Sequence, residues 1–577
     1  MRKQTKVVAV ASAAALLAIG ASMTSFAATG WVEEDGQWYF YDKDGNRVED
    51  EWKKSGDNWY WLDSEEGGAM AVDKLIEDDE DYYYVDGNGV MVTNTWVKVV
   101  NEDQDDDDDP AEYRYYYMQS NGKAYRQTGS SSNLSKKTID GKRYAFDDEG
   151  RMLYGWVTAD GTMVNDDDGW NTSDVLYYFG GWEDGSMKTG WQKITVHDNE
   201  DGKDDDYDYW FNFKSNGHRR AHANADDTWK SNSRYYHFDE RGVMVYQWFE
   251  TATTNSASAS NWAYFSSPED GARVTKGWFK VVAPTEDNSF LESDVTFAKK
   301  DSDDESERWY YSDSKDNGLV VGEIKKIKGK YYGFWPDDGQ KGGRMLVGLC
   351  ALQMNEADGS KIDKVVVADM DSDDLDDFMD TYGTKSQEET GIYLYYFGDG
   401  EDGSMKTGSV SLNLDGDSYQ FQFKKTGAAD SRGRGVNGVD DGKYIYKYGQ
   451  KVKADTDDKY TLVYANGNIN DSNVVVEDFD NSDIKGIAKT FDLAAKKGSD
   501  EDNLRGYCGF GTAQEGWYLV NTSGRIQTGT KSGTKDGYDM YWFMYKDNIK
   551  FYADDKNISD YDELKGDGWH SYFDNLK

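Results

Sequence analysis

The feature that most constrains this chain is a pattern of about twenty residues that recurs from residue 30 to near the C-terminus. Its most regular copy is WKSNSRYYHFDERGVMVYQW, over residues 229–248. A tryptophan opens the pattern, and polar residues with turn character follow. An aromatic run that favours a strand, a glycine turn and a short apolar return then lead to the next tryptophan. Each unit is therefore predicted to be a β-hairpin, and because it is too small to bury a core alone, copies must stack on one another.

The composition agrees with a stack of hairpins. Aromatic residues make up 15% of the 577 residues while all hydrophobic residues reach only 37%, so aromatic rings must supply much of the buried area. With 60 Gly and 4 Pro, the turns are built from glycine. We predict an all-β fold, an elongated solenoid of stacked β-hairpin repeats with acidic loop insertions.

The net charge of −44 excludes nucleic acid as a partner and favours cationic ligands or divalent cations. The two cysteines, Cys350 and Cys508, belong to no CxxC motif or Cys/His cluster. They form either one long-range disulfide or two buried thiols. The framework does not depend on disulfides.

The N-terminus reads as an export signal. Basic residues precede an apolar run over residues 7–21, and Ser25-Phe26-Ala27 forms a small-residue cleavage site. The apolar run is shorter than the ~20 residues that a membrane span needs. We therefore expect a secreted protein located at the bacterial cell surface, with no membrane span after removal of the signal.

The repeat pattern is interrupted twice. In the first irregular stretch, residues 364–367 are predicted to form a strand and residues 375–382 a short helix. Acidic runs elsewhere separate the two strands of a unit and are predicted to be solvated hairpin tips. The predicted organisation is a signal peptide at 1–27, a repeat array at 28–349, an irregular insertion at 350–389, repeats at 390–454, an irregular segment at 455–511 and C-terminal repeats at 512–577.

The motifs resemble the choline-binding repeats, a cell-wall-binding family related to the glucan-binding repeats of secreted glucosyltransferases. They consist of GW, then WYF or WYW, a glycine turn and a methionine, as in Gly30-Trp31 with Trp38-Tyr39 and Gly277-Trp278 with Trp309-Tyr310. The resemblance implies a hairpin solenoid with ligand sites between consecutive hairpins. Each site would combine the opening tryptophan, an aromatic residue of the second strand and an aromatic residue of the following unit.

Carried onto this chain, that arrangement groups Trp31 with Trp38 and Trp52, and it groups Trp229 with Tyr235 and Trp248. Some units depart from the family pattern, since the glycine before the tryptophan is replaced at Glu51, Thr95 and Gln247. The candidate ligand-binding residues are Trp31, Trp38, Trp52, Trp59, Trp156, Trp191, Trp229, Tyr235, Trp248, Trp278 and Trp309.

Choline carries a quaternary ammonium without a donor hydrogen, so its recognition requires a cage of ring faces. Each cation–π contact contributes about 0.5–2 kcal/mol, and repetition would add avidity. We predict a non-catalytic surface protein that binds choline-bearing teichoic acid, a peptidoglycan-linked glycan or another cell-wall polymer. The alternatives are a secreted α-glucan-binding or adhesin-like protein, and a cell-wall hydrolase such as an amidase, for which no catalytic domain is found.

One acidic group has the spacing of a calcium loop. Asp369, Asp371, Asp373 and Asp380 match positions 1, 3, 5 and 12, but Asp374 replaces the glycine needed at position 6. Calcium is therefore a weak candidate, and we predict no other cofactor.

Overall fold

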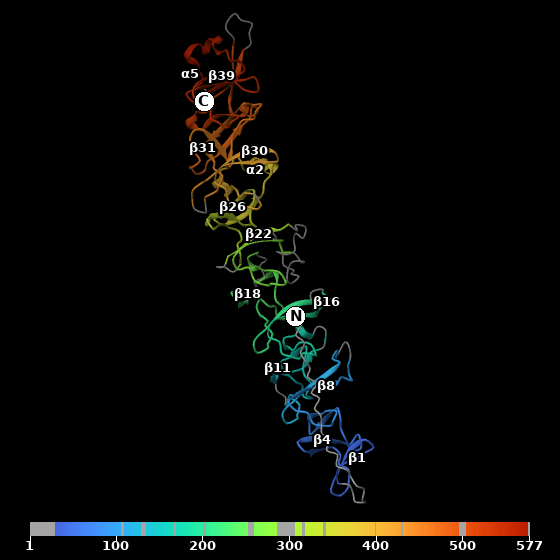
Figure 1. Cartoon of the computed structure of the whole chain (residues 1–577). Coiled ribbons are helices and arrows are strands. Elements are labelled where there is room, and N and C mark those ends of the chain that lie inside the picture. The colour runs from blue at the N-terminus through green and yellow to red at the C-terminus, as the bar shows by residue number, and fades with distance from the viewer. Residues whose placement is uncertain are drawn as a thin grey trace. The chain divides into compact units, whose positions relative to one another are not determined.

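The computed structural model in Figure 1 describes residues 29–104, 109–128, 134–164, 166, 169–199, 203–251, 259–284, 306–313, 318–337, 342–398, 400–427, 431–494 and 503–574. The predicted signal peptide lies outside these residues. The chain divides into two compact units: unit 1 comprises Met1–Val245 and Ser267–Ala272, and unit 2 comprises Tyr246–Ser266 and Arg273–Lys577. No helix in the described ranges is long and apolar enough to cross a membrane.

Unit 1 consists of small antiparallel hairpin sheets, which confirms the predicted hairpin unit. In the first hairpin the turn residues Asp35 and Gly36 have φ of 51° and 84°, as a tight two-residue turn requires. The elements are β1 (Gly30–Glu34), β2 (Gln37–Tyr41), β3 (Glu51–Ser55), β4 (Asn58–Asp63), β5 (Ala69–Met70), β6 (Lys74–Asp78), β7 (Asp81–Val85), β8 (Thr95–Val100), β9 (Tyr113–Met118), β10 (Lys136–Ile139), β11 (Lys142–Ala145), β12 (Trp156–Thr158), β13 (Met163–Val164), η1 (Gly169–Asn171), β14 (Val175–Tyr178), β15 (Gly190–Asp198), β16 (Asp205–Phe213), β17 (Trp229–Ser231) and β18 (Arg234–Tyr236).

Unit 2 begins with similar hairpins and continues into larger antiparallel sheets with a few short helices. Its elements are β19 (Gln247–Glu250), η2 (Ala259–Asn261), β20 (Trp262–Phe265), β21 (Gly277–Val281), β22 (Arg308–Asp313), β23 (Gly318–Leu319), β24 (Ile324–Ile327), β25 (Lys330–Gly333), β26 (Leu349–Met354), β27 (Ile362–Val367), α2 (Ser372–Tyr382), α3 (Gln387–Thr390), β28 (Ile392–Tyr396), β29 (Gly408–Leu414), β30 (Asp417–Phe423), β31 (Gly438–Asp440), β32 (Tyr444–Lys447), β33 (Gln450–Lys451), β34 (Tyr460–Ala465), β35 (Val476–Phe479), α4 (Ile484–Ile487), β36 (Lys489–Leu493), β37 (Leu504–Cys508), η5 (Ala513–Glu515), β38 (Trp517–Asn521), β39 (Lys531–Lys535), β40 (Tyr541–Tyr545), β41 (Asn548–Ala553), η6 (Ile558–Asp560), η7 (Asp562–Leu564), η8 (Gly566–Gly568) and α5 (Trp569–Tyr572).

The return segment after each hairpin connects it to the hairpin before. The N–H of Met91 donates to the carbonyl of Trp59 at 2.9 Å, and the N–H of Met345 donates in the same way to Trp309 at 2.9 Å. The methionine side chain then packs against the turn glycine of the next repeat, where a Cβ on Gly89 would lie 2.7 Å from Cε of Met70. The methionine and the glycine of the motif are therefore two sides of one stacking contact.

The two irregular stretches are insertions between paired strands. Strand β26 pairs with β28, and β27, α2 and α3 lie between them in sequence. Strand β34 pairs with β38, and β35, α4, β36 and β37 lie between them. The strand predicted at 364–367 and the helix predicted at 375–382 are both confirmed, as parts of β27 and α2.

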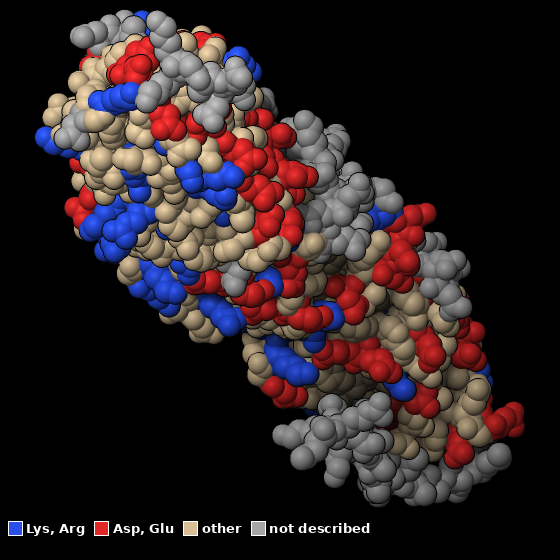
Figure 2. Space-filling model, turned by 90° about the horizontal axis from the view of Figure 1, so that it is seen from above, with Lys and Arg blue, Asp and Glu red and all other residues tan. Residues whose placement is uncertain are grey.

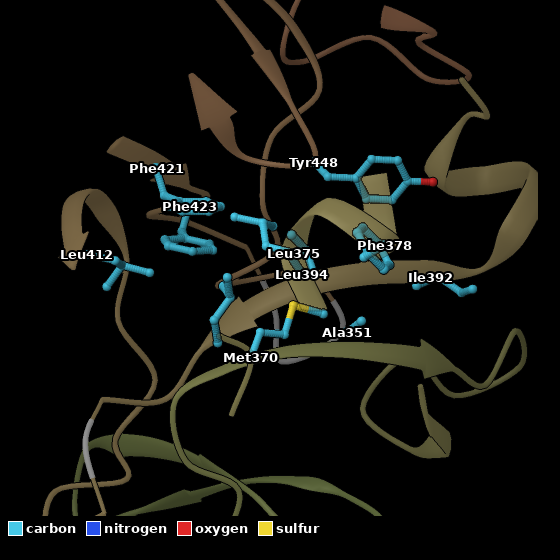
Figure 3. Close-up of a cluster of buried hydrophobic side chains, with 11 residues drawn as sticks. Ala351, Met370, Leu375, Phe378, Ile392, Leu394, Leu412, Phe421, Phe423 and Tyr448 are labelled. Carbon is cyan, nitrogen blue, oxygen red and sulfur yellow. The ribbon is translucent and has the colours of Figure 1, made fainter. Parts of the chain in front are cut away.

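Helix α2 buries its apolar face in a core shared with several strands. Figure 3 shows Leu375 and Phe378 of α2 near Leu394 and Ile392 of β28, and all four side chains belong to one buried cluster. The ring of Phe378 meets Tyr448 edge-on, with centroids 5.1 Å apart. The insertion is thus held by the same kind of aromatic packing as the repeats.

Residues 372–382 form a helix where the predicted calcium site requires a binding loop. The carboxylate of Asp371 caps that helix by accepting from the N–H of Asp374, while Asp373 lies in its first turn and Asp380 lies within it. In the described parts of the chain no three His, Cys, Asp or Glu side chains are placed to hold a metal ion.

The cysteines are two buried free thiols. Burial raises the pKa of the Cys350 thiol to about 12. Of the two alternatives for the cysteines, the structure therefore supports buried thiols.

Candidate aromatic binding sites

The opening tryptophans lie between consecutive hairpins. The strand register places Trp31 opposite Phe40 of its own hairpin, and the Trp31 ring also meets Tyr60 of the next hairpin at 5.3 Å. Trp52 repeats the arrangement with Trp61 and with Tyr83, at 5.1 Å. Rings from two hairpins therefore converge, but the following hairpin contributes a tyrosine of its second strand, so the ring beside Trp31 is Tyr60 and not Trp52.

Two of the predicted site tryptophans are core residues. Trp156 is 8% exposed and Trp248 is fully buried. The Trp248 ring contacts Tyr264 and Tyr310, with centroids 5.3 and 5.1 Å away, and its Nε1 donates to the carbonyl of Val282 at 2.9 Å. Neither ring presents an open face in the structure. Trp59 is 39% exposed, and the remaining candidates, Trp31, Trp38, Trp52, Trp191, Trp229, Tyr235, Trp278 and Trp309, are partly buried.

The most regular sequence copy is a hairpin, but its predicted rings do not form one group. Trp229 pairs across the hairpin with Tyr236, whereas Tyr235 pairs with Lys230 and therefore points to the opposite face. The guanidinium of Arg220 lies 4.1 Å from the centroid of the Trp229 ring. A resident cation thus already covers this tryptophan.

In two other copies two tryptophans stand at nearly right angles, with a tyrosine beside the first, among several rings that pack around it. We name each of these groups of three rings a cage. In the Trp191 cage, Trp191 and Trp210 lie 6.4 Å apart at 83°, and Tyr236 lies 5.0 Å from Trp191. In the Trp278 cage, the residues are Trp278, Trp309 and Tyr332. Its tryptophans lie 6.2 Å apart at 89°, and its tyrosine lies 4.7 Å from Trp278. Such converging ring faces suit a cation.

A lysine and a glutamate lie at each cage. Lys193 is opposite Trp210 across the hairpin and donates to Glu269 at 2.8 Å, and Nε1 of Trp210 donates to the other oxygen of Glu269 at 3.1 Å. The hydrogen bond from Lys193 lowers the pKa of Glu269. Both groups therefore stay charged at neutral pH.

The second cage has the same pair. Lys280 is opposite Trp309, its Nζ lies 6.0 Å from the centroid of that ring, and it pairs with Glu401 at 3.0 Å. Nε1 of Trp309 is buried and has no hydrogen-bond partner among the residues that the structure describes. The two cages thus share one arrangement and differ in the acceptor for the indole N–H.

Sequence reasoning missed Trp210, Tyr236 and Tyr332. Trp210 could have been chosen by analogy with Trp309, which was a candidate. Each of these tryptophans lies on the second strand, opposite the lysine two residues after the opening tryptophan. The tyrosines could not be chosen in the same way, because their contacts depend on which face of each hairpin meets its neighbour.

A histidine pair beside the Trp191 cage, with His237 buried and His222 partly buried, predicts a pH effect. Nδ1 of His222 accepts from the N–H of Phe238 at 3.2 Å and lies 3.2 Å from Nδ1 of His237. Burial, followed by the neighbouring His237, lowers the pKa of His222 from 6.5 to about 4. The folded state therefore favours neutral His222. The unfolded chain takes up a proton at His222 below pH 6.5, whereas the folded chain does so only near pH 4. The free energy of unfolding therefore keeps its full value above pH 6.5 and decreases as the pH falls towards 4.

Allowing for the partial exposure of His222, we expect a loss of about 1–2 kcal/mol in the free energy of unfolding of unit 1 between pH 7 and pH 4. Urea unfolding at several pH values measures it. The His222→Gln variant, which does not titrate, should show a smaller loss. Equal pH slopes in both proteins would contradict the assignment.

Stacked hairpins with aromatic rings converging between them define a class of repeat-built modules. The choline-binding repeat family matches residues 28–74, so the resemblance is confirmed and this segment belongs to that family. No curated protein matches the chain.

Several solved structures with similarity to the chain come from Streptococcus pneumoniae. The modular autolysin LytC, in complex with a synthetic peptidoglycan ligand, is 17% identical, with coverage of 58% of this chain and 57% of that chain and a TM-score of 0.28. Choline binding protein F is 17% identical, with coverage of 74% and 100% and a TM-score of 0.19. The choline-binding domain of CbpL is 23% identical, with coverage of 38% and 88% and a TM-score of 0.22. The chain thus spans little more than half the length of LytC.

Proposed function

We propose that this chain is a non-catalytic, secreted bacterial surface protein that binds choline-bearing cell-wall polymers. Its hairpins would continue as an elongated solenoid, and the polymer's choline groups would enter aromatic cages between hairpins. The observation that carries the proposal is the pair of three-ring cages at Trp191 and Trp278, each with two orthogonal tryptophans.

The geometry favours a compact cation over a sugar. A sugar ring stacks on one flat aromatic face, whereas walls at 83° and 89° with a third ring surround a roughly spherical group such as trimethylammonium. Three rings at about 0.5–2 kcal/mol each give a modest affinity per cage. Repetition along a polymer would raise the overall affinity.

The surface charge is compatible with a cationic ligand group. Acidic side chains form several patches on the face in Figure 2, while Lys and Arg gather mainly along its left side, with a few between the acidic patches. This field attracts the ammonium and repels the phosphates of a teichoic acid, but salt screens exposed charges beyond about 10 Å. Short-range ring contacts therefore decide binding.

Retention on an immobilised-choline resin tests the proposal. We expect the protein to bind and to elute with free choline. An ethanolamine resin is the matched control, because it keeps the two-carbon alcohol but carries a primary ammonium, and it should retain the protein poorly. Retention on α-glucan alone would indicate the glucan-binding alternative, and clearing of peptidoglycan by the purified protein would indicate a hydrolase.

A further inference from the structure

The sequence Glu-Asp-Gly occurs in three of the turns that follow hairpins, at residues 183–185, 269–271 and 401–403, and we name these the EDG turns. In each turn, the aspartate forms an ion pair with the basic residue that begins the second strand of an earlier hairpin, the one before the hairpin that the turn follows. The pairs are Asp184 with Lys142, Asp270 with Arg234, and Asp402 with Lys330. Each EDG turn is thus linked by an ion pair to the hairpin before the one that it follows.

The glutamate of two EDG turns reaches one hairpin further back. Glu269 pairs with Lys193 and Glu401 pairs with Lys280, and each lysine lies two residues after an opening tryptophan. These are the two hairpins that carry the cages. Because residues two apart on a strand point to the same side, each lysine shares the cage's face of its hairpin.

We propose that the Lys193–Glu269 and Lys280–Glu401 pairs are latches that set the affinity and cation specificity of the two cages. A quaternary ammonium entering a cage takes the place of the lysine beside the glutamate, and the lysine moves into solvent. This proposal rests on the proposed choline function, because a latch needs a cationic ligand to compete with it.

Charge and distance support a competition. Nζ of Lys280 lies 6.0 Å from the Trp309 centroid, at the limit of a cation–π contact, so ligand and lysine compete for the same ring and the same carboxylate. The side chains of Lys193 and Glu269 are 36% and 65% exposed, and pairs this exposed contribute little to stability. The latch can therefore open without unfolding the hairpin.

The assignment predicts opposite effects for the two partners. In Lys193→Met/Lys280→Met the competing cation is gone, so calorimetric titration with choline should show a Kd roughly two- to five-fold lower. In Glu269→Gln/Glu401→Gln the carboxylate is neutral, so the Kd should rise by a similar factor. The effect of combining all four changes should differ from the sum of the two opposite effects, because the partners act on each other.

Lys443→Met is the matched control. It breaks an ion pair with Asp441 of 2.7 Å, which is more exposed than the latches and lies outside both cages, and the choline Kd should not change. Lys193→Gln/Lys280→Gln repeats the lysine test with a polar side chain, and circular dichroism verifies folding of every variant.

The outcomes separate the latch from the proposed function. If choline binds equally to the wild type and to the lysine and glutamate variants, the latch is refuted while the choline function stands. If choline does not bind the wild type at all, both are refuted. If the lysine and glutamate variants shift the Kd in the same direction, competition is also refuted.

Discussion

Replacing Trp210 and Trp309 together by alanine should abolish retention on a choline resin and raise the Kd for free choline roughly two- to thirty-fold. Each change removes one wall of an orthogonal pair, and a single cation–π contact is worth about 0.5–2 kcal/mol, or roughly two- to thirty-fold in affinity. Retention on the resin should weaken more than the affinity for free choline does. A resin or polymer binds several sites at once, so the losses at the individual sites are compounded. Calorimetry and resin chromatography measure the two effects.

The conservative change and an unrelated aromatic residue serve as controls. Phenylalanine at both positions keeps a ring face and should restore most of the affinity. Tyr538 is 53% exposed and belongs to neither cage, so Tyr538→Ala should bind choline like the wild type. Unchanged affinity in the double alanine variant would mean that the cages do not hold the ligand.

Replacing Trp248 by alanine should act on stability, with a loss of about 3–5 kcal/mol in the free energy that protects the amides of β19 to β22 from hydrogen exchange. The ring is fully buried, so its removal leaves a cavity between Tyr264 and Tyr310 and deprives the carbonyl of Val282 of its donor. Hydrogen exchange followed by mass spectrometry reports this region directly. Since a domain's stability is about 5–15 kcal/mol, the effect is large.

Trp248→Phe should retain part of this protection, because it fills some of the cavity. Choline affinity, measured where the alanine variant is still folded, should remain close to that of the wild type. A variant with normal hydrogen exchange but weakened choline binding would instead make Trp248 a ligand contact.

Much of the local architecture follows from the sequence, because it depends on neighbouring residues. Aromatic runs bounded by turn residues predicted the hairpins, and the strand and helix of the insertion at 350–389 were confirmed. The small size of each unit predicted stacking, and the backbone hydrogen bonds of Met91 and Met345 show which strands it joins.

The membership of the candidate sites was harder to predict, because a shift of one residue turns a side chain to the other face of a strand. Tyr235 and Tyr236 are adjacent and chemically identical, yet only Tyr236 joins Trp229 and Trp191. Trp248 and Trp278 occupy the same motif position, yet the first is fully buried and the second partly exposed.

By itself, the sequence determined the repeating unit: a hairpin with a glycine turn, too small to exist alone and therefore stacked. Only the tertiary structure decided which rings converge and which charges meet them. Lys193 lies 76 residues from Glu269, and Lys280 lies 121 residues from Glu401. Contacts over such separations depend on how successive hairpins pack, which no local pattern records, whereas a turn or a strand is specified by the few residues that form it.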